Sequence, residues 1–489
     1  MIRPSLIAGG MRRGRGRGQA VAEAAGSFAD GHDLFGLEGN ESFSPSSPTL
    51  KDGTSVSGDM ADYLAAYAYW RDNQENAHAD TKLTNVMGST NNYTAARRGQ
   101  TIHDVVSRAF RLTGDLRDLD YLCAGYDVLQ SSLDTGGAGG GPRIEWDAGW
   151  ENESLVESEC GTDDAWSPYR KLNGGGSSGG PTDLNRLNVL KLWALVAEFT
   201  WMLHLNQGKT SPGSVDYATR LTYWKARLEE FVRAWSLDTA DCWANNYIGV
   251  DGDGGLSGVP NISSSRSRQE WGKYPFATRD EGHAIWNTIM AHRYIGLLGQ
   301  HASLDILNPD DALTAAEAMV NAIRDNGSYK ACSNADHGDS LVMTWTNPLR
   351  GDTSVPMRMT YTGYQGASLL QLWLTGAYRT KWSLTDMQHL GSAFAWAHDG
   401  VSGDTHGNIT RGAAECGLDA VSDTGRSASD NSVRGFAALP IVFDPGGAKM
   451  TDIADNLITL SGGLSTPDRA AVFSALFVRE ALSAAGDIS

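Results

Sequence analysis

From residue 58 onward, apolar positions recur every three to four residues, the spacing of helices that bury one face. The run VDYATRLTYWKARLEEFVRAWSL (215–237) shows this spacing clearly, as does STPDRAAVFSALFVREALSAAG (465–486). The pattern, with helix start and stop signals, predicts about twelve helices, at 58–76, 99–113, 116–134, 183–206, 213–236, 281–299, 309–325, 359–377, 383–398, 430–442, 449–461 and 466–485. The sequence therefore predicts an all-α fold with minor strands in its loops, such as SLVMTW at 340–345.

The predicted connections alternate between long and short along the chain. Long connections fall near 77–98, 135–182, 237–280, 326–358 and 399–429. In an up-down array of helices, alternate connections lie at the same end, so these five would share one face. Long loops in a compact domain usually carry function. The simplest closed arrangement is an (α/α) toroid of about six helix hairpins, and two separate helical domains are the alternative.

Residues 1–57 are rich in Gly, Ser and Pro and show no sustained period, which predicts an extended N-terminal arm. No shift in composition divides the rest, so we expect residues 58–489 to form one toroidal catalytic domain. The N-terminal stretch has no apolar run typical of a secretion signal, and no segment has the roughly 18 apolar residues that would span a bilayer. We expect an extracellular or virion-associated protein, delivered as part of an assembly.

The chain carries a formal net charge of -18, which argues against nucleic acid and anionic membranes as general partners. A local arginine cluster could still bind an acidic substrate at short range. The five cysteines are widely spaced without a CxxC motif, so neither a disulfide framework nor a zinc cluster is indicated. We expect no metal ion or other cofactor, and the sequence predicts no particular oligomeric state.

The helix predicted at 281–299 carries His283, Asn287 and Tyr294 at offsets of four and seven residues. This spacing places an imidazole, an amide and a phenol on one helical face, opposite aliphatic side chains. Such a face is typical of the wall of a polar cleft, or of a buried helix whose polar groups are paired locally.

Further candidates come from the predicted long connections and the helix starts that follow them. They are Asn91, Asn92, Tyr93, Arg97, Arg98, His103, Trp146, Trp150, Trp271, Arg279, Arg358, Tyr361, Tyr364, His406, Arg411, Arg426 and Arg434. An arginine within reach of a tyrosine hydroxyl lowers the pKa of that phenol, which can then serve as a general base and afterwards as an acid. Arg358 and Tyr364 suit these roles, and packing at the lip of a ring is the alternative for Tyr361 and Tyr364.

These residue types, over roughly 58–485, resemble the polysaccharide lyases built on an (α/α) toroid, of the alginate, glucuronan and chondroitin lyase type. The resemblance rests on the His283/Asn287 pair, on the Asn91-Asn92-Tyr93 stretch before a helix, and on Arg358 with Tyr364. It implies β-elimination in an anionic, uronic-acid-containing polysaccharide, without a cofactor.

The resemblance also implies roles for individual residues. Asn287, His283 and Arg358 would neutralise or orient the C5 carboxylate, while Tyr364 would remove the C5 proton and protonate the leaving oxygen. In an open variant His283 is the base and Tyr364 only the acid. The expected substrate-binding residues are Asn91, Asn92, Tyr93, Arg97, Trp146, Trp150, Trp271, Arg279 and Tyr361.

Two other functions fit the same pattern. A glycoside hydrolase on this fold would need two carboxylates, for which Asp147 or Glu151 with Asp280 or Glu281 are candidates. A non-catalytic glycan-binding protein of a virion or cell surface would use the same cleft without turnover.

Overall fold

The computed structural model describes part of the chain. The described residues are 36–51, 53–73, 82–88, 96, 98–134, 144–146, 170–172, 184–235, 283–305, 309–310, 312–314, 316–317, 320, 329–334, 340–345, 357–358, 366, 369–376, 379, 381–398, 418–419, 439, 441–443 and 467–484.

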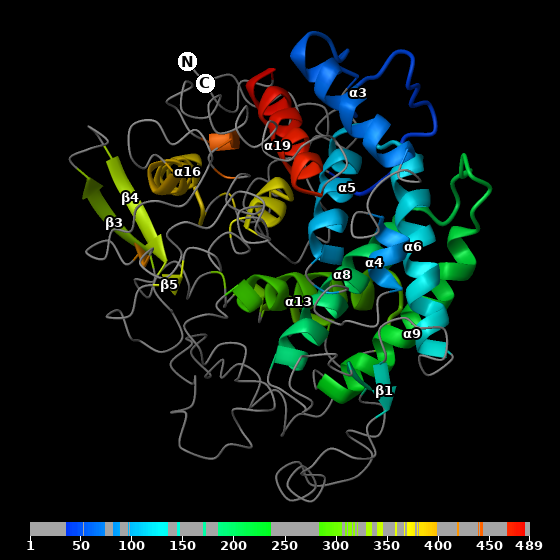
Figure 1. Ribbon diagram of the computed structural model, residues 1–489. Coiled ribbons are helices and arrows are strands. Elements are labelled where there is room, and N and C mark those ends of the chain that lie inside the picture. Colours follow the sequence, from blue (N-terminus) through cyan, green and yellow to red (C-terminus); the bar gives the residue numbers. More distant parts are fainter. Residues whose placement is uncertain are drawn as a thin grey trace, which may run out of the picture.

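The described part of the chain is mostly helical, as the sequence predicts (Figure 1). The helices are α3 (Asp59–Asp72), α4 (Leu83–Met87), α5 (Gly99–Thr113), α6 (Leu116–Asp134), α8 (Leu184–Asn206), α9 (Tyr217–Trp235), α13 (His283–His301), α16 (Leu384–His398) and α19 (Pro467–Ala484). Helical residues also occur within 309–320, 366–374 and 439–443. The short helix α4 was not predicted, and the helix predicted at 449–461 lies outside the described residues.

Short strands form three two-stranded sheets among the described residues. The pairs are β1 (Ile144–Trp146) with β2 (Arg170–Leu172), β3 (Tyr329–Asn334) with β4 (Ser340–Trp345), and β5 (Met357–Arg358) with β6 (Leu418–Asp419). The first two pairs are antiparallel and the third is parallel. β4 is the strand predicted from SLVMTW.

The break between α5 and α6 follows from two residues. Gly114 ends α5 with a φ of 71°, a left-handed conformation that favours glycine, and its N–H donates to the carbonyl of Phe110. A Cβ at Gly114 would meet the backbone nitrogen of Asn40 at 2.8 Å. Asp115 then accepts the backbone N–H of Arg117 at 3.1 Å, which caps the start of α6. Both helix boundaries are therefore encoded locally.

Helices that follow one another in the chain pack together, α5 with α6 and α8 with α9. α8 also contacts α13, and the contacts of Glu198 with Tyr294 and of Trp201 with His301 show that these two helices run in the same direction. α13 lies very close to the helical residues at 309–320, because a Cβ on Gly296 would come within 2.6 Å of Leu313. Farther along, the indole of Trp373 donates to the carbonyl of Trp382 at 2.9 Å, linking residues 369–376 to the start of α16.

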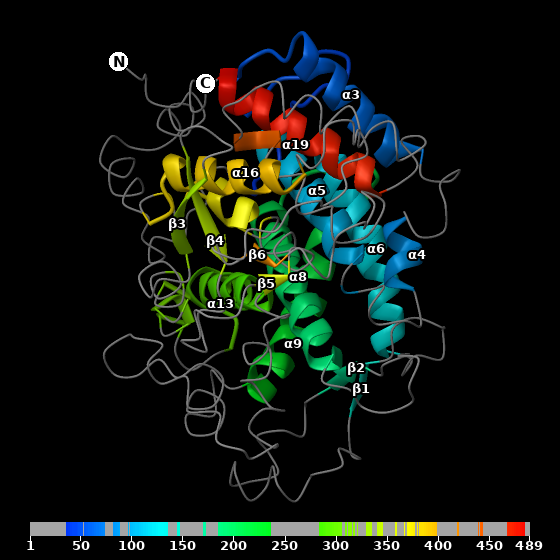
Figure 2. The ribbon, with the colours of Figure 1, turned by 60° about the vertical axis from the view of Figure 1, so that its left-hand side comes forward.

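The C-terminal helix returns to the first helices of the fold. α19 packs against α3 and α5, and both ribbon views show it running beside them (Figures 1 and 2). The guanidinium of Arg479 in α19 also donates to the carbonyl of Ile441 at 3.1 Å. α19 thus bridges helical residues near the end of the chain and the helices at its beginning.

α5 and α13 run in the same direction. Gln100, near the start of α5, bonds Asn287 near the start of α13, while Arg111 farther along α5 bonds Tyr294 farther along α13. Alternate helices in an up-down array run parallel, so the two helices begin at the same end of the molecule.

The described part of the predicted arm, residues 36–51 and 53–57, lies against the helices and is called the strap below. Leu37 and Leu50 in the strap are buried. The amide of Asn206 holds the strap to the end of α8, accepting from Gly39 N–H at 2.6 Å and donating to the carbonyl of Leu37 at 2.7 Å. The backbone N–H groups of Asn40 and Lys51 donate to the carbonyls of Gly114 and Leu112, at 2.7 and 2.9 Å, so the strap also contacts the end of α5.

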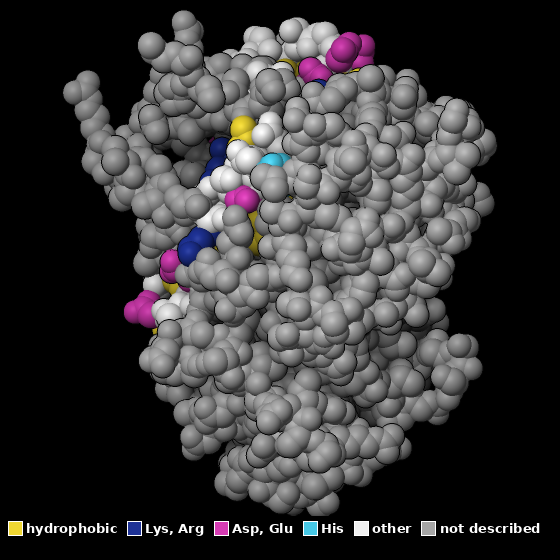
Figure 3. Space-filling model, turned by 90° about the vertical axis from the view of Figure 1, so that its left-hand side faces the viewer, with side chains coloured by type: hydrophobic (Ala, Val, Ile, Leu, Met, Phe, Trp, Pro, Cys, Tyr) yellow, Lys and Arg dark blue, Asp and Glu magenta, His cyan; other side chains and the backbone are white. Residues whose placement is uncertain are grey.

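Large aromatic side chains fill the core around these helices. Trp224, Trp373 and Trp382 are fully buried, and the ring of Tyr126 stacks on Phe199 with centroids 4.1 Å apart. On the face in Figure 3, charged side chains of both signs and some hydrophobic side chains of the described residues reach the surface. Within the described residues, no helix combines the length and apolar character needed to cross a membrane.

Candidate functional site

Two rows of polar side chains run along α5 on its buried side. One row is Gln100, Asp104 and Arg108, and the other is His103, Ser107 and Arg111. Residues four apart lie above one another on a helix, so each row forms a stripe. All six are at most 2% exposed. Buried polar groups require partners, and these come from α6, α8, α13 and residues 369–374.

Glu198 of α8 is the centre of this polar core. Its Oε1 accepts hydrogen bonds from Ser107 Oγ at 2.7 Å, Arg111 Nη2 at 2.8 Å and Gln371 Nε2 at 2.8 Å. Arg111 Nη2 also donates to the hydroxyl of Tyr294 at 2.6 Å. A single buried carboxylate therefore ties α5 and α8 to residues 369–374, and through Arg111 to α13.

His103 lies on the other side of Glu198. Its Nε2 is 3.4 Å from Glu198 Oε2, and its Nδ1 is 3.0 Å from the hydroxyl of Tyr126 on α6. Burial raises the pKa of Tyr126 well above its usual value, and the charges of Glu198 and Asp104 add to this. The phenol of Tyr126 therefore stays neutral and holds the imidazole in place.

Two carboxyls of the polar core have opposite ionisation properties. Burial favours the neutral form of Glu198, but His103, Arg111 and Ser107 outweigh it and hold the Glu198 pKa well below its usual range. In Asp104 burial dominates over the opposing effects of Arg108 and His103, and raises its pKa to about 7. Asp104 Oδ1 is buried and has no hydrogen-bond partner. Near neutral pH, Glu198 is thus ionised while Asp104 is partly protonated.

Asn287 lies in a second polar layer, toward the starts of α5 and α13. Its Oδ1 accepts a hydrogen bond from Gln100 Nε2 at 3.0 Å, and the residue is 1% exposed. His283 is the first residue of α13, one helical turn before Asn287. His283 and Asn287 therefore lie on one helix, as the sequence predicts.

The structure describes two more of the predicted site residues through their backbone. Arg358 lies in β5, in register with Asp419 of β6, and Trp146 lies in β1, in register with Arg170 of β2. The remaining predicted site residues lie outside the described residues: Asn91, Asn92, Tyr93, Arg97, Trp150, Trp271, Arg279, Tyr361 and Tyr364. The proposed hydrolase carboxylates Asp147, Glu151, Asp280 and Glu281 also lie outside them.

Sequence reasoning missed the residues that organise this core. Glu198 stands in the apolar run LWALVAEFTWML, and the one charge in such a run must have a buried partner. A second sign of a buried polar core is the spacing of polar residues along α5. Gln100, Asp104 and Arg108 stand four residues apart and therefore form one stripe. His103 was named only for its position near a loop, and the structure makes it part of the buried core.

The part of the polar core around Glu198 and His103 is sealed from solvent. It can still orient the side chains of Gln100 and Asn287, which lie nearer the helix starts. Glu198 and His103 are 0% exposed, so they hold helices in register and do not present an open reactive surface. In the described part of the chain, no group of three or more His, Cys, Asp or Glu residues is arranged to hold a metal ion. The layer of Gln100 and Asn287, nearer the helix starts, is the part best placed to support a binding site.

The chain matches no protein-family model, no curated protein and no solved structure.

Proposed function

We propose that the chain is a polysaccharide lyase with an (α/α) toroid fold, acting on a uronic-acid-containing polymer such as alginate or glucuronan. The fold part of this proposal is supported by successive helix hairpins and by the packing of α19 against α3 and α5, near the start of the chain. The parallel course of α5 and α13 supports it further, since alternate helices of a toroid begin at the same face.

The observation that carries the proposal is the hydrogen bond between Gln100 and Asn287. It fixes an amide between the first turns of two parallel helices, one turn beyond His283. Because Oδ1 of Asn287 accepts from Gln100 Nε2, the side-chain amide of Asn287 is held in one orientation. An oriented amide of this kind stabilises charge that develops on a carboxylate.

In the proposed reaction, Asn287, His283 and Arg358 neutralise the C5 carboxylate of the sugar, which makes the C5 proton removable. Tyr364 removes that proton and then protonates the leaving glycosidic oxygen, so that the C4–O4 bond breaks and a C4–C5 double bond forms. Gln100 is a positioning residue, because it acts through Asn287. The sealed core around Glu198 keeps α5, α8 and α13 in register beneath this layer.

The test is digestion of a panel of uronate polymers, with ultraviolet absorbance and reducing ends followed in parallel. A lyase raises both, because each cleavage creates a conjugated double bond and a new reducing end. Tyr364→Phe should abolish both rises, and Asn287→Ala should reduce the rate by about 10²- to 10³-fold. Asp280→Asn is the matched control and should leave the rate largely unchanged.

A further inference from the structure

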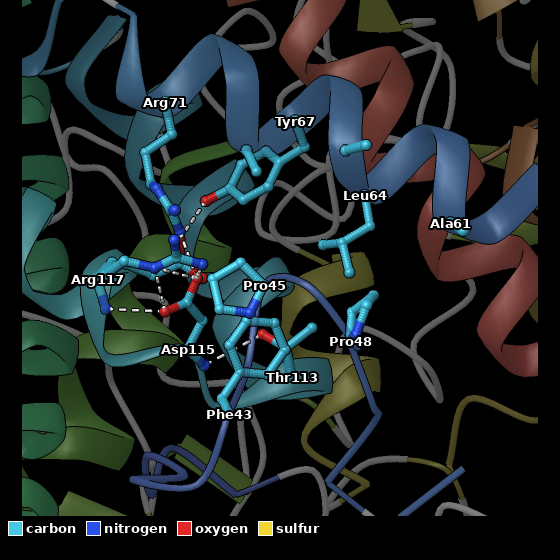
Figure 4. Close-up of a pocket in the computed structure, with 13 residues that line it drawn as sticks. Phe43, Pro45, Pro48, Ala61, Leu64, Tyr67, Arg71, Thr113, Asp115 and Arg117 are labelled. Atoms are coloured by element: carbon cyan, nitrogen blue, oxygen red, sulfur yellow. Dashed lines mark hydrogen bonds and ion pairs between the residues drawn. The ribbon is translucent and has the colours of Figure 1, made fainter. Parts of the chain in front are cut away.

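The ion-pair network around Arg71 shows how this fold fixes a guanidinium group with carboxylates from another element. Arg71 of α3 donates from Nη1 to Asp115 Oδ2 at 2.8 Å and to Asp118 Oδ1 at 2.5 Å, both near the start of α6. Arg117 binds the same Asp115 with Nη2 at 2.6 Å from Oδ2. Figure 4 shows Arg71, Asp115 and Arg117 beside a small pocket enclosed by α3, the strap and the turn between α5 and α6. Carboxylates that bind an arginine in this way hold its guanidinium in one orientation.

A second arginine and carboxylate are placed next to each other by the parallel pairing of β5 and β6. Arg358 of β5 is in register with Asp419 of β6, and Met357 is in register with Leu418. Successive residues of a strand belong to opposite faces of a sheet, so residues in register on neighbouring strands share a face. Met357 and Leu418 therefore share one face, while Arg358 and Asp419 share the other. Neighbouring strands lie about 4.8 Å apart, a separation that an arginine and an aspartate can span with an ion pair.

The chemistry of the two register pairs matches across the strands. One pair is apolar on both sides, and the other combines a cation with an anion. Opposite charges in register on adjacent strands stabilise the strand pairing, whereas like charges oppose it. β5 and β6 also come from two different predicted long connections, 326–358 and 399–429. The pairing therefore brings together two connections that lie far apart in the chain.

The position of Arg358 gives this pairing a consequence for the proposed reaction. Both ribbon views place β5 near α13, the helix that carries His283 and Asn287 (Figures 1 and 2). A cation that neutralises a carboxylate in the transition state must be held in place before the reaction. Arginine has a long side chain with many rotamers, so a partner is needed to fix it. One carboxylate does not occupy all the N–H donors of a guanidinium, and the remaining donors can bind the substrate.

We propose that Asp419 is a positioning residue, which holds the guanidinium of Arg358 toward the C5 carboxylate of the bound uronate. Asp419 acts through Arg358 and does not touch the sugar. This inference rests on the proposed function, because it gives Arg358 its orientation in that reaction. It also contains a structural part, the pairing of Arg358 with Asp419, which can be measured without any substrate.

The pairing is tested by exchanging the two charges in the full chain. Arg358→Asp and Asp419→Arg each place like charges in register, so each should lower the midpoint of thermal unfolding. The double variant has opposite charges again, and its midpoint should rise above those of both single variants. A double variant that is no more stable than the single variants would show that the two residues are not paired, and would overturn the proposal.

The positioning role is tested by the rate of uronate cleavage, followed by ultraviolet absorbance. Asp419→Ala should lower kcat by about 10- to 100-fold and change KM by about twofold or less, because a misplaced guanidinium fails mainly in the transition state. Arg358→Ala keeps Asn287 and His283 and therefore some turnover. In that background Asp419→Ala should cause no further loss. An equal loss in both backgrounds would show a merely structural role and overturn the proposal.

Leu418→Ala is the matched control, since Leu418 is next to Asp419 in β6 but belongs to the opposite face. It should lower the midpoint of thermal unfolding and leave the kcat of the folded protein unchanged. A loss of kcat as large as that of Asp419→Ala would overturn the positioning role. Failure of the unmodified chain to cleave any uronate polymer would overturn the proposed function itself, whereas a failed charge exchange in an active chain would overturn only the role of Asp419.

Discussion

The polar core around Glu198 and the ion-pair network around Arg71 each contain one carboxyl with a lowered pKa and one with a raised pKa. The two networks differ in how far they are closed to solvent. Each holds one carboxylate whose pKa is kept low, Glu198 in the core and Asp115 beside Arg71, because cationic and hydroxyl donors outweigh burial. Each also holds one carboxyl, Asp104 or Asp118, whose pKa burial raises to about 7.

In the core around Glu198, the difference between the two carboxyls lies in their direct partners. Glu198 accepts three close hydrogen bonds on Oε1, whereas Asp104 Oδ1 has no hydrogen-bond partner. Burial is similar for both, so the donors decide the ionisation state. The two networks differ from each other in access, because the core is sealed while Asp118 lines a pocket.

The largest effect should come from Glu198→Ala. Removal of this carboxylate leaves Arg111 buried without its main counter-charge, so the free energy of unfolding should fall by about 3–5 kcal/mol. Urea unfolding measures this change. Glu317→Ala, at an exposed position, is the control and should change stability by about 0.5 kcal/mol or less. A loss below about 1 kcal/mol for Glu198→Ala would show that the core network does not hold the helices.

Arg71→Ala should have the next largest effect, about 2–4 kcal/mol, because it leaves Asp118 and Asp115 partly unpaired under the strap. Arg117 binds the same Asp115 from a more exposed position, with 29% of its side chain accessible. Arg117→Ala should therefore lose only about 1 kcal/mol. Equal losses from the two variants, measured by urea unfolding, would contradict the distinction between the buried and the exposed arginine.

The pH dependence of stability should separate the two kinds of carboxyl. The raised pKa of Asp104 means that the folded state binds more protons than the unfolded state between about pH 4 and pH 7, so this residue weakens folding as pH rises through that window. Asp104→Asn should therefore reduce the loss of stability between pH 5 and pH 8 by about 1–3 kcal/mol. Asp118→Asn should act in the same direction.

For Glu198 and Asp115, the change of folding stability with pH should have the opposite sign. Their lowered pKa values stabilise the folded state above the unfolded values, and this contribution is lost as pH falls below about 4. Thermal unfolding across pH 3–8 measures both trends. An unchanged pH profile in Asp104→Asn would contradict the assignment of a raised pKa to that carboxyl.

The smallest effect should come from the partly exposed pair of Arg220 and Asp127, whose atoms Nη2 and Oδ2 are 2.5 Å apart. Asp127→Ala should lower the free energy of unfolding by about 0–1 kcal/mol, and the loss should shrink at high salt. A loss as large as that from Glu198→Ala would remove the contrast between buried and exposed ion pairs.

Helix positions could be predicted from the sequence because their boundaries are encoded locally. Gly114 and Asp115 separate α5 from α6. Ser383 caps α16, because its Oγ accepts the backbone N–H of Asp386 at 3.2 Å while Asp386 Oδ2 accepts the backbone N–H of Ser383 at 2.9 Å. The short helix α4 was missed because five residues are too few to show a helical period.

The partners inside the core could not be predicted. Gln371 and Ser107 form a hydrogen bond although 264 residues separate them, and only the packed helices bring them together. The sequence placed His283 and Asn287 on one helix, but Gln100, the partner of Asn287, came from a helix 187 residues away. Periodicity indicates which face of a helix is buried, and it does not identify what that face meets.

The most direct test of the proposed function is digestion of uronate polymers followed by ultraviolet absorbance, with reducing ends counted in the same samples. The account predicts that both rise together for at least one polymer, and that Gln100→Ala lowers the rate less than Asn287→Ala does. Reducing ends without the ultraviolet product, or binding of the polymers without cleavage, would contradict it.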